Sequence, residues 1–98
     1  PMSEEAASSW LDALQLDDWL DLKTHERWQR VQLGWTNDGR TLFMFVGRGG
    51  SPHSMTRRVC LRLARDGELR LAAEQGPRKL TKLSSKVADH GDSTFASL

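Results

Sequence analysis

The chain has 98 residues, with 14 basic against 13 acidic side chains and a net charge of +1. This length accommodates one hydrophobic core and argues against two independent domains. Hydrophobic residues make up 38% of the chain, which is below the usual share for a compact domain, so part of the chain is expected to lie outside the core. The near-zero net charge gives no support for polyanion binding through overall charge.

Three further features narrow the class of protein. No stretch approaches the roughly 20 apolar residues that span a bilayer, and the acidic N-terminus does not resemble a signal peptide. The single cysteine, Cys60, cannot form an internal disulfide and suits a reducing compartment, so we expect a cytoplasmic protein. Pro1-Met2 is typical of a protease-site remnant ahead of a native start, so we expect a piece of a longer protein.

The charges are distributed unevenly along the chain. Residues 1–26 carry seven acids and one base, giving −6, whereas residues 27–98 carry thirteen bases and six acids, giving +7. Such a split arises either from contact between the two parts or from a charged binding face. Both interpretations remain open.

The first predicted elements are a short helix and a strand. The helix covers about residues 9–15, where apolar side chains recur at helical spacing after two serines that suit the N-cap. At about two turns this helix must dock on the rest of the chain to be stable. A strand follows over residues 18–23, with Leu20 and Leu22 on one side. The apolar helix residues are Trp10, Leu11 and Leu14.

A β-hairpin is predicted over residues 28–36 and 40–46. Asn37-Asp38-Gly39 lies between the two strands and is the strongest turn signal in the chain, because Gly supplies positive φ and Asn and Asp tolerate it. The first strand alternates between an apolar face and a face with Arg30 and Gln32, which is typical of a half-buried strand. The expected core residues of this strand are Val31, Leu33 and Trp35.

The second hairpin strand is apolar on both faces. Phe43 and Phe45 alternate with three other apolar residues, so both sides of the strand should be covered. One face fills the interior of a small barrel, and the other needs a helix, a tail or a partner protein over it. The alternating residues are Leu42, Met44 and Val46.

The remaining elements complete a small mainly β (α+β) fold. A short strand over 53–56 leads through the cap residue Thr56 into a helix over about 57–66, which ends at Gly67. Residues 68–72 form a closing strand. We therefore expect a partly open β-barrel of about five strands with one well-formed helix and weaker terminal helices.

Three segments are expected from this pattern. Residues 1–15 form an N-terminal tail and short helix, and residues 16–72 form the barrel domain. Residues 73–98 form a basic tail, in which Leu80, Leu83 and Val87 lie at helical spacing among lysines and arginines. A basic amphipathic helix and disorder are both compatible with this tail.

A group of arginines surrounds the glycine-rich segment 47–52. Guanidinium groups, backbone N–H groups of a Gly-rich turn and a helix start all favour anions, so a nucleotide or an acidic peptide is chemically reasonable here. No phosphate-loop or dinucleotide fingerprint is present, and solvated surface arginines explain the same pattern. The candidate ligand-binding residues are Arg48, Arg57, Arg58 and Arg62.

A second candidate surface contains an outward tryptophan. Trp28 lies in phase with Arg30 on the polar side of its strand, so it forms either a recognition patch or a ring covered by the N-terminal helix or the tail. The candidate partner-binding residues are Trp28, Arg30, Phe43 and Phe45.

Catalysis and metal binding are not expected. His25, His53 and His90 fall in separate segments, and no HxxxH, HExxH or CxxC motif is present. Cys60 lies in phase with Val59 and Leu63 on the apolar side of its helix and is expected to be buried. We expect no catalytic residue, no metal and no cofactor.

The stretch from Leu16 to Leu71 resembles the C-terminal segment of a family of long proteobacterial proteins of unknown function, often labelled thymidine phosphorylase. The resemblance covers just over half of the chain, and its motifs are mostly structural. It implies a fold unit of a larger bacterial protein. The matching residues are Leu16–Leu22, Val31–Trp35, Arg40–Val46, Gly49 or Gly50, Ser54–Arg58 and Gly67–Leu69.

The strand pattern is also similar to small PilZ- and SH3-like barrels. PilZ domains bind cyclic di-GMP through an RxxxR motif ahead of the barrel and a D/N-x-S-x-x-G motif within it. This sequence departs from both, because no arginine precedes Asp18 and no D/N-x-S-x-x-G motif occurs. The leading hypothesis is a non-catalytic protein-interaction module of a bacterial cytoplasmic protein. The alternative is PilZ-like binding of a cyclic dinucleotide, another nucleotide or nucleic acid through the arginine-rich loop.

Overall fold

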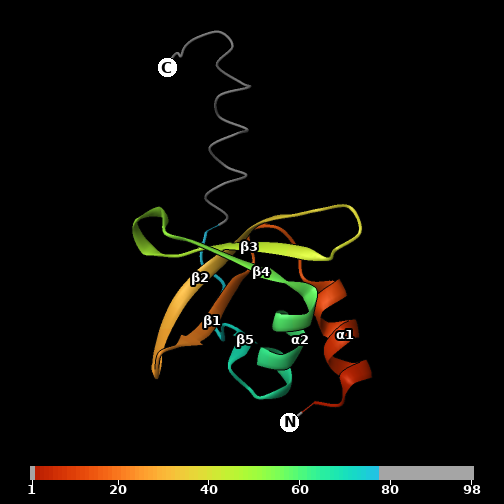
Figure 1. Cartoon of the computed structure of the whole chain (residues 1–98). Coiled ribbons are helices and arrows are strands. Elements are labelled where there is room, and N and C mark those ends of the chain that lie inside the picture. The colour runs from red at the N-terminus through yellow and green to blue at the C-terminus, as the bar shows by residue number, and fades with distance from the viewer. Residues whose placement is uncertain (1, 78–98) are drawn as a thin grey trace, which may run out of the picture.

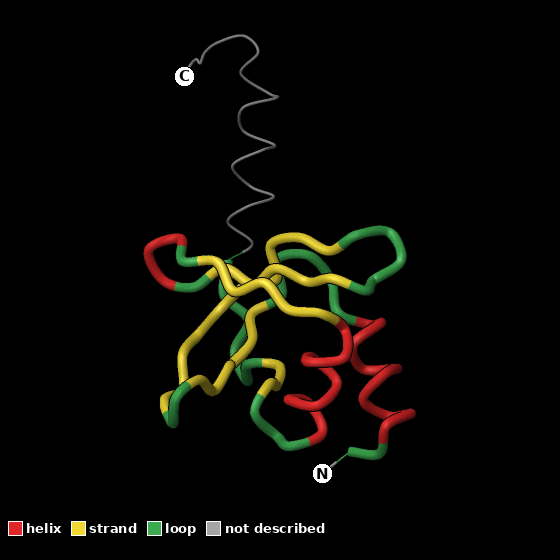
Figure 2. Tube along the Cα trace, viewed as in Figure 1, coloured by secondary structure: helices red, strands yellow, loops and turns green. Residues whose placement is uncertain are grey.

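The computed structural model describes residues 2–77 as a five-stranded antiparallel sheet with two α-helices (Figures 1 and 2). The predicted tail helix lies outside the described residues. In chain order the elements are α1 (Glu4–Ala13), β1 (Trp19–Thr24), β2 (Arg27–Thr36), β3 (Leu42–Val46), the 3-10 turn η1 (Arg48–Gly50), β4 (Pro52–Thr56), α2 (Arg57–Arg65) and β5 (Leu69–Leu71).

The strands lie in the order β4-β3-β2-β1-β5, and every neighbouring pair is antiparallel. The sheet is not closed, because the described parts of the edge strands β4 and β5 do not pair with each other. Instead, α2 leads from β4 towards β5 and contacts both strands, while α1 lies beside α2 (Figure 1). The predicted mainly β fold of about five strands is confirmed, and the predicted partly open barrel is not.

Helix α1 begins five residues earlier than the sequence predicts. Its N-cap is Ser3, whose Oγ accepts a hydrogen bond from the Ala6 N–H at 3.1 Å. Glu4 and Glu5 occupy the first turn, where carboxylates interact favourably with the helix dipole. The prediction that Ser8 or Ser9 is the N-cap is therefore wrong. Ser3 caps the helix in the same way, and the helix that begins after it is longer.

Helix α2 confirms its predicted start and end. Thr56 Oγ1 accepts a hydrogen bond from the Val59 N–H at 3.3 Å. At the other end Gly67 has φ +76°, and its N–H donates to the Ala64 carbonyl at 3.1 Å. The Glu68 N–H donates to the Leu63 carbonyl at 2.8 Å, which completes a Schellman motif.

The β2–β3 pairing contains a bulge that changes the side of one tryptophan. Leu33 pairs with Phe45, whereas Trp35 pairs with Met44, so β2 has one extra residue, Gly34. This residue moves Trp35 to the face opposite Leu33, and Trp35 is 47% exposed. The prediction that Trp35 belongs to the core is wrong, since simple alternation does not continue through a bulge.

The turn between β2 and β3 also differs in detail from the prediction. Arg40, not Gly39, has the left-handed conformation, with φ +54°. The side chain of Arg40 donates to the carbonyls of Asp12 and Leu14 at 3.0 and 2.6 Å, so it is held at the end of α1. These contacts offset the steric cost of positive φ at a residue with a Cβ.

One face of the sheet, called the inner face below, carries the core. Phe43 and Phe45 lie on it with stacked rings whose centroids are 6.3 Å apart, and both side chains are fully buried. The helices cover this face with Leu11 and Cys60, together with Leu14 at the C-cap of α1. The sheet contributes Leu20, Leu22, Val31, Leu33, Phe43, Phe45 and Leu69 to this cluster.

Candidate functional site

The opposite side of the sheet, called the outer face below, carries an apolar cluster near the turn that joins β2 to β3. Trp35 pairs directly with Met44, and Leu42 lies two residues from Met44 on the same side of β3. Trp35 and Leu42 are 47% and 45% exposed, and Met44 is half-buried. On β4, Thr56 pairs with Leu42 and Ser54 pairs with Met44. The β4 residues paired with this cluster therefore carry hydroxyl groups and no charge.

The other end of the outer face carries Trp28 with cations around it. Trp28 pairs with Lys23 across β1 and is 44% exposed. The Arg70 guanidinium carbon lies 4.1 Å from the centroid of the Trp28 ring, and Lys23 Nζ lies 6.0 Å away. Arg30 Nε donates to Asp21 Oδ1 at 2.7 Å. Cation–π contact thus holds this half-exposed ring in place.

The last described residues cross the middle of the outer face. Trp19 Nε1 donates to the Pro77 carbonyl at 3.1 Å. Gln75 accepts from the Trp19 N–H at 2.8 Å and donates to the Trp19 carbonyl at 2.9 Å. A Cβ on Gly76 would lie 3.1 Å from Trp19 Nε1. Within residues 2–77, the chain thus covers Trp19 and leaves both ends of the outer face exposed.

The structure separates the predicted partner-binding residues. Trp28 and Arg30 lie together on the outer face, as the strand pattern predicts. Phe43 and Phe45 lie on the inner face and are 1% and 0% exposed, so their assignment to a binding surface is wrong. The reason is that the helices cover the phenylalanine side of β3, not the side with Leu42.

Among the predicted ligand-binding residues, Arg57 is engaged within the fold. Its Nη1 donates to Asp12 Oδ1 at 2.8 Å and to the Arg40 carbonyl at 3.0 Å, and its Nη2 donates to Ser8 Oγ at 2.7 Å. The hydrogen bond from Arg57 lowers the pKa of Asp12 below its ordinary value. Arg57 therefore joins α2 to α1 and to the β2–β3 turn.

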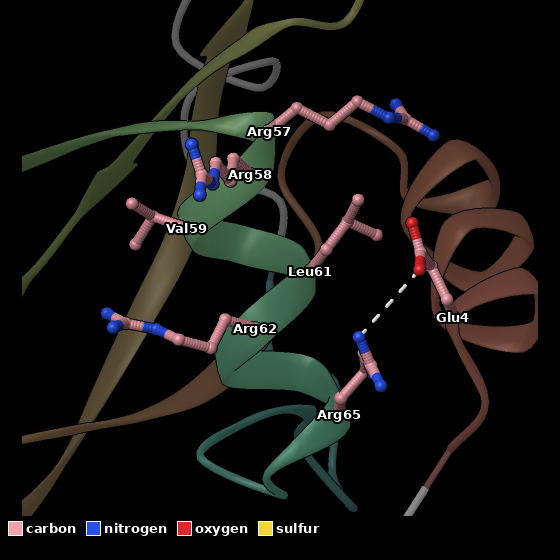
Figure 3. A pocket seen from close by; sticks show the side chains of 7 residues that line it. All are labelled: Glu4, Arg57, Arg58, Val59, Leu61, Arg62 and Arg65. Atoms are coloured by element: carbon pink, nitrogen blue, oxygen red, sulfur yellow. Dashed lines mark ion pairs between the residues drawn. The ribbon is translucent and has the colours of Figure 1, made fainter.

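The other three predicted arginines do not form one group. Arg48 lies in η1, just before β4, whereas α2 begins after the other end of β4 (Figure 1). The five extended residues of β4 span about 17 Å, which separates Arg48 from the start of α2. Arg58 and Arg62 lie one turn apart on α2 and are exposed. Figure 3 shows their side chains extending from the same side of the helix.

Ion pairs explain part of the charge asymmetry. Asp12 pairs with Arg57 at 2.8 Å, and Asp21 pairs with Arg30 at 2.7 Å. Glu4 lies 3.9 Å from Arg65. Each pair joins an acid of the N-terminal part to a base of the rest, which supports contact between the two parts.

The side chains that could take part in catalysis or metal binding do not form a site among the described residues. Cys60 is fully buried, and burial raises the pKa of its thiol to about 12, so the reactive thiolate is suppressed. Among residues 2–77 no cluster of three or more His, Cys, Asp or Glu side chains could hold a metal ion. No helix in this part of the chain is long and apolar enough to cross a membrane.

Sequence reasoning missed two members of the exposed clusters. Arg70 alternates with Leu69 and Leu71 in the predicted closing strand, so its outward position was readable from that alternation. Simple alternation places Trp35 on the wrong side of the sheet, although the neighbouring Gly34 is a signal for a bulge in a strand.

Comparison with protein-family models, curated proteins and solved structures finds no match to this chain.

Proposed function

We propose that this domain is a non-catalytic protein-interaction module that binds its partner through the outer face of the sheet. One observation carries the proposal. Five large apolar side chains are exposed in the described residues, and three of them, Trp28, Trp35 and Leu42, lie on this face. Exposed apolar clusters of this kind mark interaction sites.

The partner is a protein segment that presents large apolar side chains. The Trp35–Met44–Leu42 cluster has no charged neighbour in register, and interface cores are enriched in aromatic residues and Met and depleted of charges. At the other end Arg70 lies on Trp28 without an ion pair in the described part of the chain. Trp and Arg are frequent hot-spot residues, so a carboxylate at that end of the partner segment completes the interface.

The experiment is selection of short peptides from a random library displayed on phage, followed by binding measurements with the purified peptides. The test variant is Trp35→Ser with Leu42→Ser. The matched control is Leu16→Ser with Leu71→Ser, which removes two other exposed apolar side chains away from the cluster. We expect selected peptides rich in large apolar residues and an affinity loss of about tenfold or more in the test variant alone.

Two results would contradict the proposal. One is a selection in which no peptide is enriched on the wild-type domain over the Trp35→Ser/Leu42→Ser variant. The other is an equal affinity loss in the test and control variants. Circular dichroism of both variants checks that each retains the wild-type fold.

The alternative of nucleotide binding needs Arg48, Arg57, Arg58 and Arg62 in one site. The distance between Arg48 and α2 and the internal contacts of Arg57 do not favour that set. Arg58 and Arg62 belong instead to a different group of side chains, described next.

A further inference from the structure

The exposed side of α2 carries a row of three arginines, called the arginine row below. Arg58, Arg62 and Arg65 are exposed and spaced at i, i+4 and i+7, which places them on one side of the helix. At 1.5 Å rise per residue their Cα atoms are separated along the axis by about 6 Å and about 4.5 Å. The side chains of Arg58 and Arg62 extend to one side of α2, and that of Arg65 extends towards Glu4 of α1 (Figure 3).

These guanidinium groups have little compensation within the fold. Arg58 and Arg62 form no hydrogen bond or ion pair with the described residues. Arg65 Nη1 lies 3.9 Å from Glu4 Oε1, and the Glu4 side chain is 74% exposed (Figure 3). An exposed pair at this distance contributes little to stability, so Glu4 is easily displaced.

The arginine row borders a hollow of about 610 Å³. Its lining contains four arginines and one carboxylate, together with the apolar side chains of Val59 and Leu61 (Figure 3). A second hollow of about 330 Å³ shares Arg62 and Arg65. Arg57, at the end of the first hollow, is fixed by Asp12 and Ser8 and keeps α2 in place against α1.

We propose that the arginine row binds an acidic helical segment of a protein. Carboxylates at i and i+4 on such a helix repeat at about the spacing of Arg58 and Arg62, and arginine binds a carboxylate through two parallel hydrogen bonds. A third carboxylate replaces Glu4 on Arg65. Apolar side chains between the carboxylates contact Val59 and Leu61.

The lining favours a peptide over a nucleic acid. Single-stranded nucleic acids are bound by aromatic side chains that stack on the bases, in addition to basic groups. The residues that line the two hollows include no aromatic side chain. They do include aliphatic side chains, which suit an amphipathic peptide.

The test uses a fluorescently labelled synthetic helical peptide with glutamates at i, i+4 and i+7 and leucines between them. Its binding is measured by fluorescence anisotropy at about 50 mM salt, where exposed charges are weakly screened. The variant Arg58→Gln with Arg62→Gln is expected to weaken binding about tenfold or more. The control Arg27→Gln with Arg48→Gln removes two exposed arginines elsewhere and is expected to change binding by less than about twofold.

Two further arms make the result specific. Glu4→Gln removes the competing carboxylate and is expected to tighten binding. A short oligouridylate and cyclic di-GMP are titrated under the same conditions. Equal losses in the arginine-row variant and the control would overturn the proposal, and so would tighter binding of either nucleic-acid probe than of the peptide. The Trp35→Ser/Leu42→Ser variant should bind the acidic peptide normally, which separates this proposal from the one for the sheet.

Discussion

The two sides of strand β3 consist of similar residues and have opposite environments. Phe43 and Phe45 are buried on the inner face, whereas Leu42, one residue before Phe43, is 45% exposed on the outer face. The difference comes from the connections, because both described helices pack on the inner face, and among residues 2–77 the outer face is crossed only by the segment 75–77. An apolar strand therefore indicates that both faces are suited to burial, without showing which face the chain itself buries.

The largest expected effect is on the inner face. Phe45→Ala removes a fully buried ring from the core and leaves a cavity, so the free energy of unfolding should fall by about 3–5 kcal/mol. Leu42→Ala, on the outer face, should cost less than about 1 kcal/mol. Urea unfolding monitored by circular dichroism measures both, and similar losses for the two variants would show that the outer face belongs to the core.

A smaller effect is expected where the helices are fastened over the inner face. Arg57→Gln breaks the contacts to Asp12, Ser8 and the Arg40 carbonyl and should cost about 1–3 kcal/mol. Arg58→Gln, at the next position, has no such contacts and should stay within about 0.5 kcal/mol of the wild type. Thermal unfolding of both variants tests the contrast, and an equal response would remove Arg57 from its bridging role.

The smallest of these stability effects concerns the end of α2. Gly67 has φ +76°, so Gly67→Ala forces a Cβ into the left-handed region and should cost about 1–2 kcal/mol. Gly39→Ala is the matched control, because Gly39 does not have positive φ and its added Cβ would meet Thr41 at an ordinary 3.9 Å. Guanidinium unfolding should separate the two variants, and equal stabilities would contradict the Schellman cap.

Local patterns in the sequence predict most of the elements of this fold. The turn residues, the cap at Thr56 and the glycine at Gly67 each act within a few residues of the chain, so the hairpin and α2 are predicted nearly to their ends. The inner position of Leu20 and Leu22 follows from alternation.

The features that the sequence does not predict depend on contacts between distant residues. The bulge at Gly34 depends on pairing with β3, and the covered side of β3 depends on where α1 docks. Arg40 and Arg57 are occupied by α1 and its C-cap Leu14, at least 26 residues away in the chain. Charge and spacing alone therefore do not separate bridging arginines such as Arg57 from exposed ones such as Arg58.

The most direct test of the central claim is a nitrogen–proton NMR titration of the labelled domain with a peptide selected on it. We predict chemical-shift changes concentrated on the side-chain indole N–H of Trp35 and on the backbone amides of β2 and β3 around it, with the amides of α2 unchanged. Shift changes confined to α2, or spread evenly over both faces of the sheet, would contradict the assignment of the outer face as the binding surface.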